Sequence, residues 1–591
     1  DGLTDPAPRR PPGPPEPPAD PRFPTAAYDA CLTGDQVRSL EALEALSDPG
    51  SAVVVSADRG RGKSSAAGLA AGALAAEGRE VVVTAPGYRN AAEVFDRARE
   101  LLESLDELAG WDGSAKLLTS VAGGRVRFVP PTAAAEMSES DGPDALVVDE
   151  AAALPVRLLE GLLATEAALA FATTVHGYEG AGRGFDVRFR DRLAESDRDV
   201  VDVTMTDPIR YAPGDPVETW AFRALLLDAR PAVDPLVVDA GVEDCAYVEL
   251  EAGGLLEDEH RLREAFGLLV LAHYRTEPDD LARLLDAPNV AVRALTYEDS
   301  VVCVALLARE GGLSAERRRR MYEGERVRGN MLPDVLTSQL RDEAGGVPVG
   351  LRVLRIATHP AVRSRGLGSR LLDEVATDAR EGRFDWPGGV DSGTDYLGVG
   401  YGATPRLVRF WAENGFGTLH LSTTRNDTSG EYSALMARPL TDAGRALRDR
   451  TDDWFRRRVG SVLADALRDA DPDVVREVLA ATAQRAHPDL TDREWRTVAA
   501  AAFGPGLYDA APRPFRELAL AHLTEGSADL SPGDERLLVR KVLQARTWER
   551  VTEEGPYVSK REAMRSLGSA YRPLVERYGT RAAHEEAARY R

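Results

Sequence analysis

A glycine-rich turn between an apolar run and a helix-like segment is the feature that most constrains this sequence. The run SAVVVSA (51–57) has the β-branched composition of a buried strand. It leads into Asp58-Arg59-Gly60-Arg61-Gly62-Lys63-Ser64, and an alanine-rich segment (64–78) follows. Glycines let successive backbone N–H groups converge on an anion, and a helix N-terminus adds partial positive charge. The pattern predicts a phosphate-binding loop; the plainer alternative is a glycine turn that only caps the helix.

A second motif supplies the partner that such a loop needs for nucleotide hydrolysis. The apolar run ALVVDEA (145–151) ends in Asp149 and Glu150. Lys63 would reach the β- and γ-phosphates, while Ser64 and Asp149 would bind Mg²⁺ and Glu150 would lie beside the attacking water. Alone, Asp-Glu after a strand is most often a solvated turn. Together, the motifs predict an ATPase with Lys63 and Glu150 as catalytic residues.

The order of strand-like and helix-like segments predicts an α/β multidomain fold. Strand-like runs at 80–86, 125–131, 169–175 and 200–205 alternate with helical stretches, which favours a parallel sheet covered on both faces. We expect a Pro-rich linker at 1–27, a RecA-like P-loop ATPase domain of helicase type at 28–235 and a second α/β domain at 236–440. The pattern from 441 to 591 is almost wholly helical.

Composition excludes several classes of protein. No run of about 18 apolar residues is present, which argues against a membrane span, and no charged-then-apolar leader suggests secretion. The three cysteines, Cys31, Cys245 and Cys303, lie far apart without a CxxC pair. This spacing argues against zinc ribbons and disulfide frameworks and favours a reducing cytoplasm.

The charge is strongly acidic but unevenly distributed. The net charge is −23, and there are only four lysines, Lys63, Lys116, Lys541 and Lys560. This composition is typical of proteomes adapted to high salt, so net charge is a weak guide to partners. Residues 441–591 hold 26 basic and 25 acidic residues, a net +1 against −24 for the first 440. The helical tail is therefore expected to meet an anionic partner.

A second glycine turn lies in the middle of the chain. The strand-like run LRVLRIAT (351–358) leads through His359 into Arg363-Ser-Arg-Gly366-Leu-Gly368-Ser369 and an amphipathic helix-like segment. A further run at 395–400 precedes a helix that ends in Asn414-Gly415-Phe416. Such a turn presents backbone N–H groups to a pyrophosphate, and the set looks like the coenzyme A site of the GCN5-related N-acetyltransferase fold. An ordinary βα unit with a capping glycine is the alternative.

Seven motifs in one order resemble the tRNA(Met) cytidine acetyltransferase family, whose eukaryotic relatives also modify ribosomal RNA. They are ADRGRGKS, VVDEAA, DPIRY, AHYRTEPDDL (272–281), GNMLPDVL (329–336), RIATHP with RSRGLGS, and NDTSGEYS (426–433). The resemblance implies ATP-dependent transfer of acetyl from acetyl-CoA to cytidine N4, at the wobble position of elongator tRNA(Met) and in other RNA. Family members carry a further N-terminal domain, and because the chain starts with Asp we expect that this domain was cut away or lost.

The resemblance also implies roles for individual residues. It assigns the ATP site to Gln36, Asp58, Arg59, Gly60, Arg61, Gly62, Lys63, Ser64, Ser65, Asp149 and Arg210. It assigns the acetyl-CoA site to Ile356, Ala357, Thr358, Arg363, Ser364, Arg365, Gly366, Leu367, Gly368 and Ser369. His273 matches a histidine implicated in catalysis. Arg363 replaces a frequent Gln, a change compatible with an anion. Arg406 and Glu413 stand where relatives carry Glu and Arg, so their cofactor roles are not transferred.

The chemistry of the acceptor sets what else the site must contain. The N4 lone pair of cytosine is delocalised into the ring and must lose a proton during attack, so a general base is expected. His273 is the first candidate and His359 the second. Backbone N–H groups near residues 356–358 would polarise the thioester carbonyl, and Tyr401 would protonate the departing thiolate.

The sequence is also compatible with two other functions, and it suggests one surface for binding RNA. The chain could be a protein N-acetyltransferase with an accessory ATPase, or an RNA helicase whose acetyltransferase fold only binds. Arg456, Arg457 and Arg458 follow Trp454 and Phe455 in the tail and are predicted to contact tRNA. The alternative is that the three arginines only form a solvated helix face beside Trp454 and Phe455, which would pack in the core.

Overall fold

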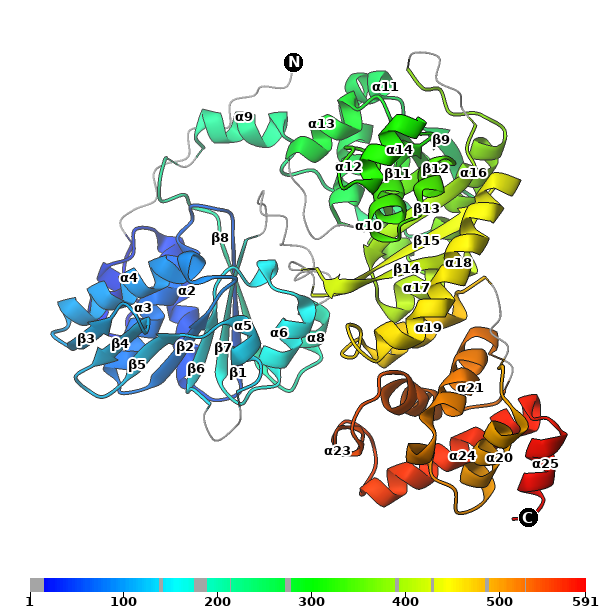
Figure 1. Ribbon diagram of the computed structural model, residues 1–591. Coiled ribbons are helices and arrows are strands. Elements are labelled where there is room, and N and C mark those ends of the chain that lie inside the picture. Colours follow the sequence, from blue (N-terminus) through cyan, green and yellow to red (C-terminus); the bar gives the residue numbers. More distant parts are fainter. Residues whose placement is uncertain are drawn as a thin grey trace.

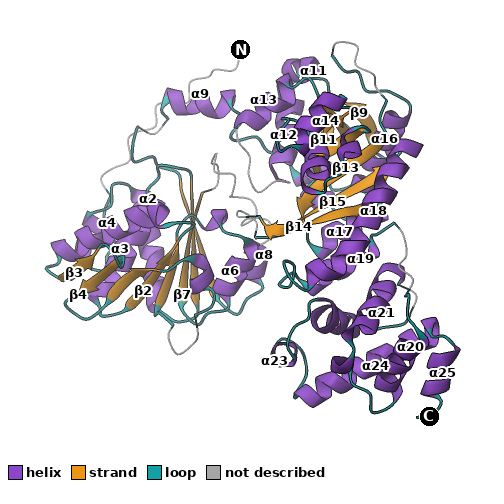
Figure 2. Cartoon of the chain, viewed as in Figure 1, coloured by secondary structure: helices purple, strands orange, loops and turns teal. Residues whose placement is uncertain are grey.

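Two sheets covered by helices, followed by a helical region, make up the chain (Figures 1 and 2). The computed structural model describes residues 15–137, 142–174, 189–212, 214–271, 278–387, 393–426, 430–483, 488–526 and 528–590. Over these residues the predicted α/β multidomain class is confirmed. No helix within them is long and apolar enough to cross a lipid bilayer.

The first sheet has the strand order β3-β4-β5-β2-β6-β7-β1-β8. From β5 to β8 every neighbouring pair is parallel, as the alternating pattern predicted. The strands are β1 (Ser51–Ala57), β2 (Glu80–Thr84), β3 (Leu108–Asp112), β4 (Leu117–Ser120), β5 (Arg125–Phe128), β6 (Ala145–Val148), β7 (Ala168–Thr174) and β8 (Asp199–Met205).

Helices cover both faces of this sheet. Alternate residues of β1 enter separate cores, because side chains in a strand point to opposite faces. Val53 and Val55 pack with the helices α2, α3 and α4, whereas Val54 packs with Leu159 of α6. The helices are α1 (Thr25–Asp29), α2 (Gly34–Leu43), α3 (Lys63–Ala76), α4 (Tyr88–Ser104), α5 (Pro131–Ala134), α6 (Val156–Leu163), α8 (Arg190–Ala194) and α9 (Pro216–Ala224).

The edge of the first sheet departs from the predicted parallel arrangement. β3 and β4 form an antiparallel addition beside β5. The sequence of β3, Leu-Ala-Gly-Trp-Asp, has no apolar alternation, and its side chains are exposed or half-buried. An edge strand of this kind buries little, so its sequence carries almost no strand signal.

The second sheet has the order β14-β15-β13-β12-β11-β10-β9. β12 and β13 pair in parallel, whereas the other neighbouring pairs in this order are antiparallel. The strands are β9 (Ala246–Glu249), β10 (Val290–Tyr297), β11 (Ser300–Gly311), β12 (Val349–Thr358), β13 (Tyr396–Gly402), β14 (Gly417–Arg425) and β15 (Tyr432–Pro439).

A seam opens between β12 and β13. The two strands pair along Gly350–Val353 and Tyr396–Val399, and both continue beyond this pairing. The register of β12 against β11 shifts at Leu354, where pairing with β13 has just ended. A bulge bends a strand and increases its twist, so β12 turns away from β13. The carboxyl halves of the two strands therefore present backbone groups to each other across an opening.

Helices cover the two faces of the second sheet separately. Leu268 of α12 packs with Val304 on one face, whereas Leu371 of α16 packs with Val302 on the other. The helices are α10 (Asp234–Val237), α11 (Ala252–Glu257), α12 (Glu259–Leu271), α13 (Pro278–Asp286), α14 (Ala315–Tyr322), α15 (Met331–Asp334), a π-helix (Val335–Gln339), α16 (Leu367–Arg380) and α17 (Pro405–Glu413).

The helical tail shares its hydrophobic core with the second sheet. α18 packs on β14 and β15, and α19 packs on β14. Phe455 of α18 is buried in the core that also holds Leu397 of β13. The predicted boundary at 441 therefore ends the sheet without interrupting the core. The tail helices are α18 (Asp442–Leu463), α19 (Pro472–Ala480), α20 (Asp492–Phe503), α21 (Pro512–Glu525), α22 (Pro532–Leu537), α23 (Trp548–Glu553), α24 (Lys560–Tyr578) and α25 (Arg581–Ala587).

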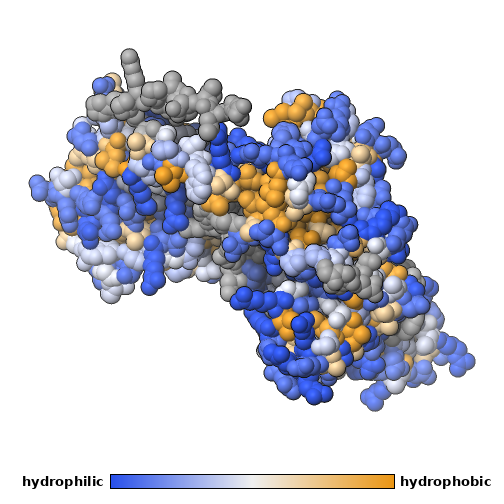
Figure 3. Space-filling model, turned by 90° about the horizontal axis from the view of Figure 1, so that it is seen from above, coloured by the Kyte–Doolittle hydropathy of each residue, from blue (hydrophilic) through white to orange (hydrophobic). Residues whose placement is uncertain are grey.

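Hydrophilic residues cover much of the surface, and apolar residues gather near the middle of the face in Figure 3. This surface agrees with a chain in which 29% of residues are charged.

Candidate active sites

The predicted phosphate loop joins β1 to α3 with two glycines in left-handed conformation. Gly60 has φ 80° and Gly62 has φ 90°. A Cβ on Gly62 would lie 2.3 Å from Nε2 of Gln36, so no other residue fits there without displacing that side chain. Gln36 is buried, and its Oε1 accepts a hydrogen bond from the Leu32 N–H at 2.7 Å. The structure thus places Gln36 directly behind the loop.

The four predicted catalytic and metal-binding side chains meet at the carboxyl end of β6. Lys63 Nζ lies 2.9 Å from Glu150 Oε1, and the Ser64 hydroxyl donates to Asp149 Oδ1 at 3.1 Å. Lys63 and Ser64 come from the start of α3, while the carboxylates follow β6, two strands away from β1. Parallel strands bring these ends to one edge, which is where ligands bind in open α/β sheets.

Asp149 is arranged to accept a cation. The side chain is fully buried, and within the described part of the chain its Oδ2 has no hydrogen-bond partner. Burial, with the neighbouring charge of Glu150, raises the pKa of Asp149 to about 6, although Lys63 opposes the shift. Asp149 and Ser64 would supply hard oxygen ligands of the kind that Mg²⁺ prefers, and a bound divalent cation would offset the burial of this carboxylate.

Glu150 is held in a sparsely populated conformation. Its backbone lies in the left-handed region, with φ 49° and ψ 45°, and its Oε2 accepts a hydrogen bond from the Thr174 hydroxyl at 3.0 Å. Non-glycine residues in this region are strained, and such strain concentrates at functional sites. The carboxylate is therefore fixed between the loop lysine and the end of β7.

The remaining predicted nucleotide contacts surround the loop in different ways. Asp58 and Arg59 lie in the turn itself, and the Ser65 hydroxyl accepts from Arg97 at 3.0 Å. The Arg61 guanidinium is buried and donates to Tyr211 at 2.8 Å and to Glu218, so it anchors the loop to that segment. Arg210 is exposed and lies beside Gly60.

The second glycine turn follows the seam strand β12. Ile356, Ala357 and Thr358 end the strand, and the turn 363–366 precedes α16. Ser364 and Gly366 have φ 60° and 88°. The chain thus presents a helix N-terminus beside the opening between β12 and β13, as a pyrophosphate site requires.

Side chains around this turn divide into anchors and exposed groups. Arg365 donates to the backbone oxygen of Val238 at 2.6 Å, which ties the turn to the segment before β9. Arg363 and Ser364 are exposed, and the Arg406 guanidinium of α17 donates to the Ser364 hydroxyl at 3.3 Å. Leu367 is buried, while Gly368 faces Phe410 and Ser369 is half-buried.

His359 performs a structural task. Its Nδ1 accepts from the Ala361 N–H at 3.3 Å, so Nε2 carries the proton and donates to the backbone oxygen of Ala232 at 2.7 Å. The ring is 1% exposed. Because both nitrogens are engaged with backbone, the second candidate base has no nitrogen to offer a substrate. His273, the first candidate, lies outside the described residues.

Tyr401 lies on β13 beyond its pairing with β12. Its hydroxyl donates to Met436 Sδ at 2.9 Å, and the ring packs near Trp411. Burial raises the pKa of Tyr401 far above its usual value. The phenol therefore stays protonated, as a proton donor must.

The three predicted RNA-binding arginines lie on α18 and have intramolecular partners. Arg456 lies 3.4 Å from Asp452, and Arg457 lies 2.8 Å from Asp453. Arg458 points inward to His420 and Phe455, and burial lowers its pKa. Arg457 is the exposed member of the trio. Their RNA contact stays a prediction.

Sequence reasoning missed several groups that build these sites. Tyr211 is the last residue of the DPIRY motif, but no sequence pattern links its hydroxyl, or the Glu218 carboxylate, to Arg61 of the loop. The backbone oxygens of Val238 and Val242, which accept from Arg365 and Arg370, leave no trace in side-chain identity. Sequence patterns cannot reveal a contact made only by a main-chain oxygen.

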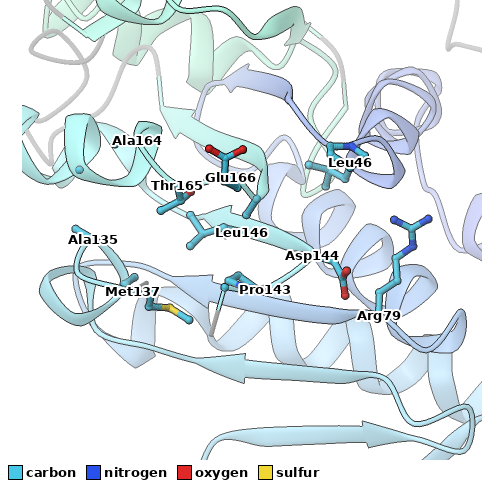
Figure 4. A pocket seen from close by; sticks show the side chains of 15 residues that line it. Leu46, Arg79, Ala135, Met137, Pro143, Asp144, Leu146, Ala164, Thr165 and Glu166 are labelled. Atoms are coloured by element: carbon cyan, nitrogen blue, oxygen red, sulfur yellow. The ribbon is translucent and has the colours of Figure 1, made fainter. Parts of the chain in front are cut away.

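A cavity of about 360 Å³ lies at the amino-terminal ends of the strands of the first sheet, away from the phosphate loop (Figure 4). Asp144 precedes β6, whereas Asp149 follows it, so this cavity is at the amino ends of the strands. Its Asp144 accepts from the Glu80 N–H at 2.7 Å, and its Arg79 donates to the Ser47 oxygen at 2.8 Å. The cavity is separate from both glycine turns.

Asp149→Asn is expected to stabilise the protein in the absence of nucleotide and cation at pH 7.5. With its pKa raised to about 6, native Asp149 binds a proton more tightly than in the unfolded chain, so stability falls as pH rises from about 4 to 6. Asn removes that loss, a gain on the order of 3 kcal/mol at pH 7.5 that shrinks toward pH 4. Denaturant unfolding at both pH values measures it; an equal difference at both would contradict it.

Gly366→Ala is expected to weaken acetyl-CoA binding roughly tenfold. Alanine is strained at φ 88°, by about 1–2 kcal/mol, and its Cβ would lie 3.3 Å from Val242 Cγ2, so the turn relaxes and its N–H groups move. Calorimetry measures the affinity. Gly526→Ala is the matched control, because Gly526 has φ 66° with nothing within 4 Å and lies in the tail. Equal loss in both variants would assign the effect to stability alone.

Comparison with known proteins gives a family match for each of the two sheet-containing regions. The family described as RNA cytidine acetyltransferase NAT10/TcmA, helicase domain, matches residues 54–228, and GNAT acetyltransferase 2 matches 264–384 and 390–441. Among solved structures, an agmatine N-acetyltransferase aligns over 33% of this chain and 100% of its own, at 16% identity and a TM-score of 0.25, a likeness too slight to carry an argument.

Relatives named tRNA(Met) cytidine acetyltransferase TmcA match almost the whole chain. The protein of Haloferax volcanii is 63% identical over 96% of this chain and 74% of its own length. That of Haloarcula marismortui is 58% identical over 100% and 75%, and that of Nitrosococcus halophilus 38% identical over 96% and 74%. With its two glycine turns and this extent of identity, the chain belongs to the tRNA(Met) cytidine acetyltransferase family.

Proposed function

We propose that this chain transfers the acetyl group of acetyl-CoA to N4 of cytidine in tRNA and hydrolyses ATP to remodel the RNA. The observation that carries the proposal is the presence in one chain of two glycine turns, each directly before a helix N-terminus. One lies beside the Lys63–Glu150 pair and the other beside the seam of the second sheet. We propose the wobble cytidine of elongator tRNA(Met) as substrate, with other RNA cytidines as further substrates.

Acetyl transfer would take place in the seam between β12 and β13. The cytidine N4 attacks the thioester carbon, a C–N bond forms, and the carbonyl electrons move to oxygen. Backbone N–H groups on the seam side of β12, near residues 356–358, stabilise that oxyanion. Collapse of the tetrahedral intermediate breaks the C–S bond and releases the CoA thiolate.

Two side chains would move the protons of this reaction. We assign His273 as the base that accepts the N4 proton, on its match to the family motif. We assign Tyr401 as the acid that protonates the thiolate, because its buried phenol stays protonated and its strand forms one side of the seam; its hydroxyl would leave Met436 Sδ, a weak acceptor, to do so. His359 is left out, since backbone groups occupy both of its nitrogens.

ATP hydrolysis would use the side chains at the end of β6. Lys63 would leave Glu150 to contact phosphate oxygens, and Glu150 would then orient the attacking water. Ser64 and Asp149 would hold Mg²⁺, which neutralises charge that develops on the phosphates. The released energy would unstack or unpair RNA so that a cytidine can enter the seam.

The surroundings of the enzyme form part of the same proposal. The three cysteines are free and buried, which suits a reducing compartment, and we place the enzyme in the cytoplasm. The helical tail is proposed to bind tRNA, as its balanced charge suggests.

Variants of the two proton-transfer residues should separate their roles. His273→Ala is expected to lower acetyl transfer by roughly 10²–10⁴-fold and to remove the acidic limb of the pH–rate profile. Tyr401→Phe keeps the buried ring, so it should lower kcat while acetyl-CoA affinity stays unchanged. ATP hydrolysis is the internal control and should persist in both. A normal kcat in either variant would withdraw that residue's role.

Mass analysis of nucleosides tests the function itself. RNA incubated with the enzyme, acetyl-CoA and ATP should yield N4-acetylcytidine. Lys63→Ala should abolish ATP hydrolysis while acetyl-CoA binding stays nearly intact, because the two turns lie on separate sheets. Acetylated protein with unmodified RNA would favour a protein acetyltransferase. ATP-dependent RNA unwinding without any acetylation would favour a helicase with a binding module.

A further inference from the structure

The helix α14 and the loop after it carry a concentrated basic surface on an acidic chain. Residues 315–330 contain six arginines and three glutamates, a net +3 where the whole chain has −23. Four of the arginines, Arg317, Arg319, Arg326 and Arg328, are exposed, and we call them the α14 arginine surface.

The other two arginines of the stretch show what makes these four different. Arg318 lies on the buried side of the helix, donates to the Leu313 oxygen at 2.6 Å and packs its stem on Gly346. Arg320 forms an ion pair with Glu325. For the α14 arginine surface, by contrast, no hydrogen bond or ion pair from the guanidinium groups is found in the described part of the chain. Their positive charge is available to an external anion.

This state is unlike that of the predicted RNA-binding trio on α18. Arg456 and Arg457 share Asp452 and Asp453, and Arg458 is partly buried against His420. Guanidinium groups held by carboxylates must leave them before they can bind phosphate. Within the described residues, the α14 arginine surface has no direct guanidinium–carboxylate contact of this kind to break, although the charge of Arg326 acts on Asp334 at longer range.

The basic surface is attached to the sheet beside the seam. α14 leads through residues 323–330 into α15, where the Leu332 N–H donates to Glu310 Oε2 at 3.0 Å. The Asn330 side chain accepts from the Gly311 N–H at 2.9 Å. Met331 lies so close to Gly400 that a Cβ there would be 2.5 Å from its Cε. Gly400 belongs to the part of β13 that has parted from β12.

The α15 side of the seam is opposite to the glycine turn. Leu332 packs in a core with Tyr396 and Leu435, whereas α16 packs in the core that holds Leu397 and Val399. Side chains of β13 therefore alternate between the face of the sheet that α15 covers and the opposite face that α16 covers. If acetyl-CoA binds at the glycine turn on the α16 side, the acceptor can reach the seam from the α15 side.

We infer that the α14 arginine surface binds the phosphate backbone of the RNA whose cytidine enters the seam from the α15 face. The inference rests on the proposed function for the identity of the acceptor. Arginine suits this partner because its planar guanidinium pairs with phosphate oxygens in a bidentate manner. At about 1 M salt the Debye length is roughly 3 Å, so contacts of this kind act while the distant acidic surface is screened.

The test replaces the four arginines with Gln in the full chain and measures binding of an unmodified tRNA transcript over a KCl series. The variant should bind roughly tenfold or more weakly. The slope of log K against log salt should fall by up to about 3, since each phosphate contact contributes about 0.7 to 0.9. For acetylation, KM for tRNA should rise, while KM for acetyl-CoA and the thermal midpoint stay unchanged.

Two further variants control for net charge and for folding. A matched control replaces four other exposed arginines with Gln and so removes the same charge from other surfaces: Arg89, Arg125, Arg223 and Arg380. Replacement of the α14 arginine surface with Lys keeps the charge and should retain most of the salt slope.

The possible results separate a failure of the RNA contact from a failure of the proposed acetyltransferase function. Unchanged affinity and slope in the Gln variant would overturn the RNA contact, and so would an equal loss in the matched control. Unchanged RNA binding with lost binding to polyglutamate would reassign the surface to an acidic protein and likewise overturn it. Absence of N4-acetylcytidine with the unmodified enzyme would overturn the function, while the RNA contact would still be judged by the binding series.

Discussion

Both sites depend on a left-handed residue placed directly before a helix. Gly62 precedes α3 and Gly366 precedes α16, with φ angles of 90° and 88°. Without a Cβ, each residue lets the chain reverse and point its N–H groups along the helix axis toward an anion. The strands before them, β1 and β12, fix where each turn lies. The rest of each site is built around that position, by Gln36 and Arg61 at the first turn and by Arg365 at the second.

The parts that were predicted from sequence are those where chemistry demands particular residue types in order. Lys63, Ser64, Asp149 and Glu150 could be placed together because a loop and a strand end needed them at a known spacing. The strand β3 and the packing of α18 could not, because exposed edges and shared cores impose only weak patterns. His359 illustrates a different limit: its position beside a cofactor turn suggested catalysis, whereas its Nδ1 caps the short 3₁₀-helix Pro360–Val362 and its Nε2 bonds to Ala232.

The number of arginines in a segment of this chain is a poor measure of how many guanidinium groups can bind an external anion. The tail is nearly neutral in sequence, yet Arg456, Arg457 and Arg476 lie in ion pairs with aspartates of their own helices. A charge count therefore could not locate an anion-binding surface, since it registers each arginine and not its neighbours. In a chain so rich in carboxylates, a guanidinium without a partner is more informative than a basic stretch.

The continuous core between the second sheet and the tail has a consequence for how such an enzyme can evolve. Leu397 of β13 and Phe455 of α18 belong to one cluster that extends to Ala583. A recombination event at residue 441 would expose apolar surface on both products, at a cost of about 25 cal/mol for each Å² uncovered. The tail helices are therefore not an exchangeable module. Change in the tail is expected to proceed by substitutions on its surface, and not by exchange of the whole helical region.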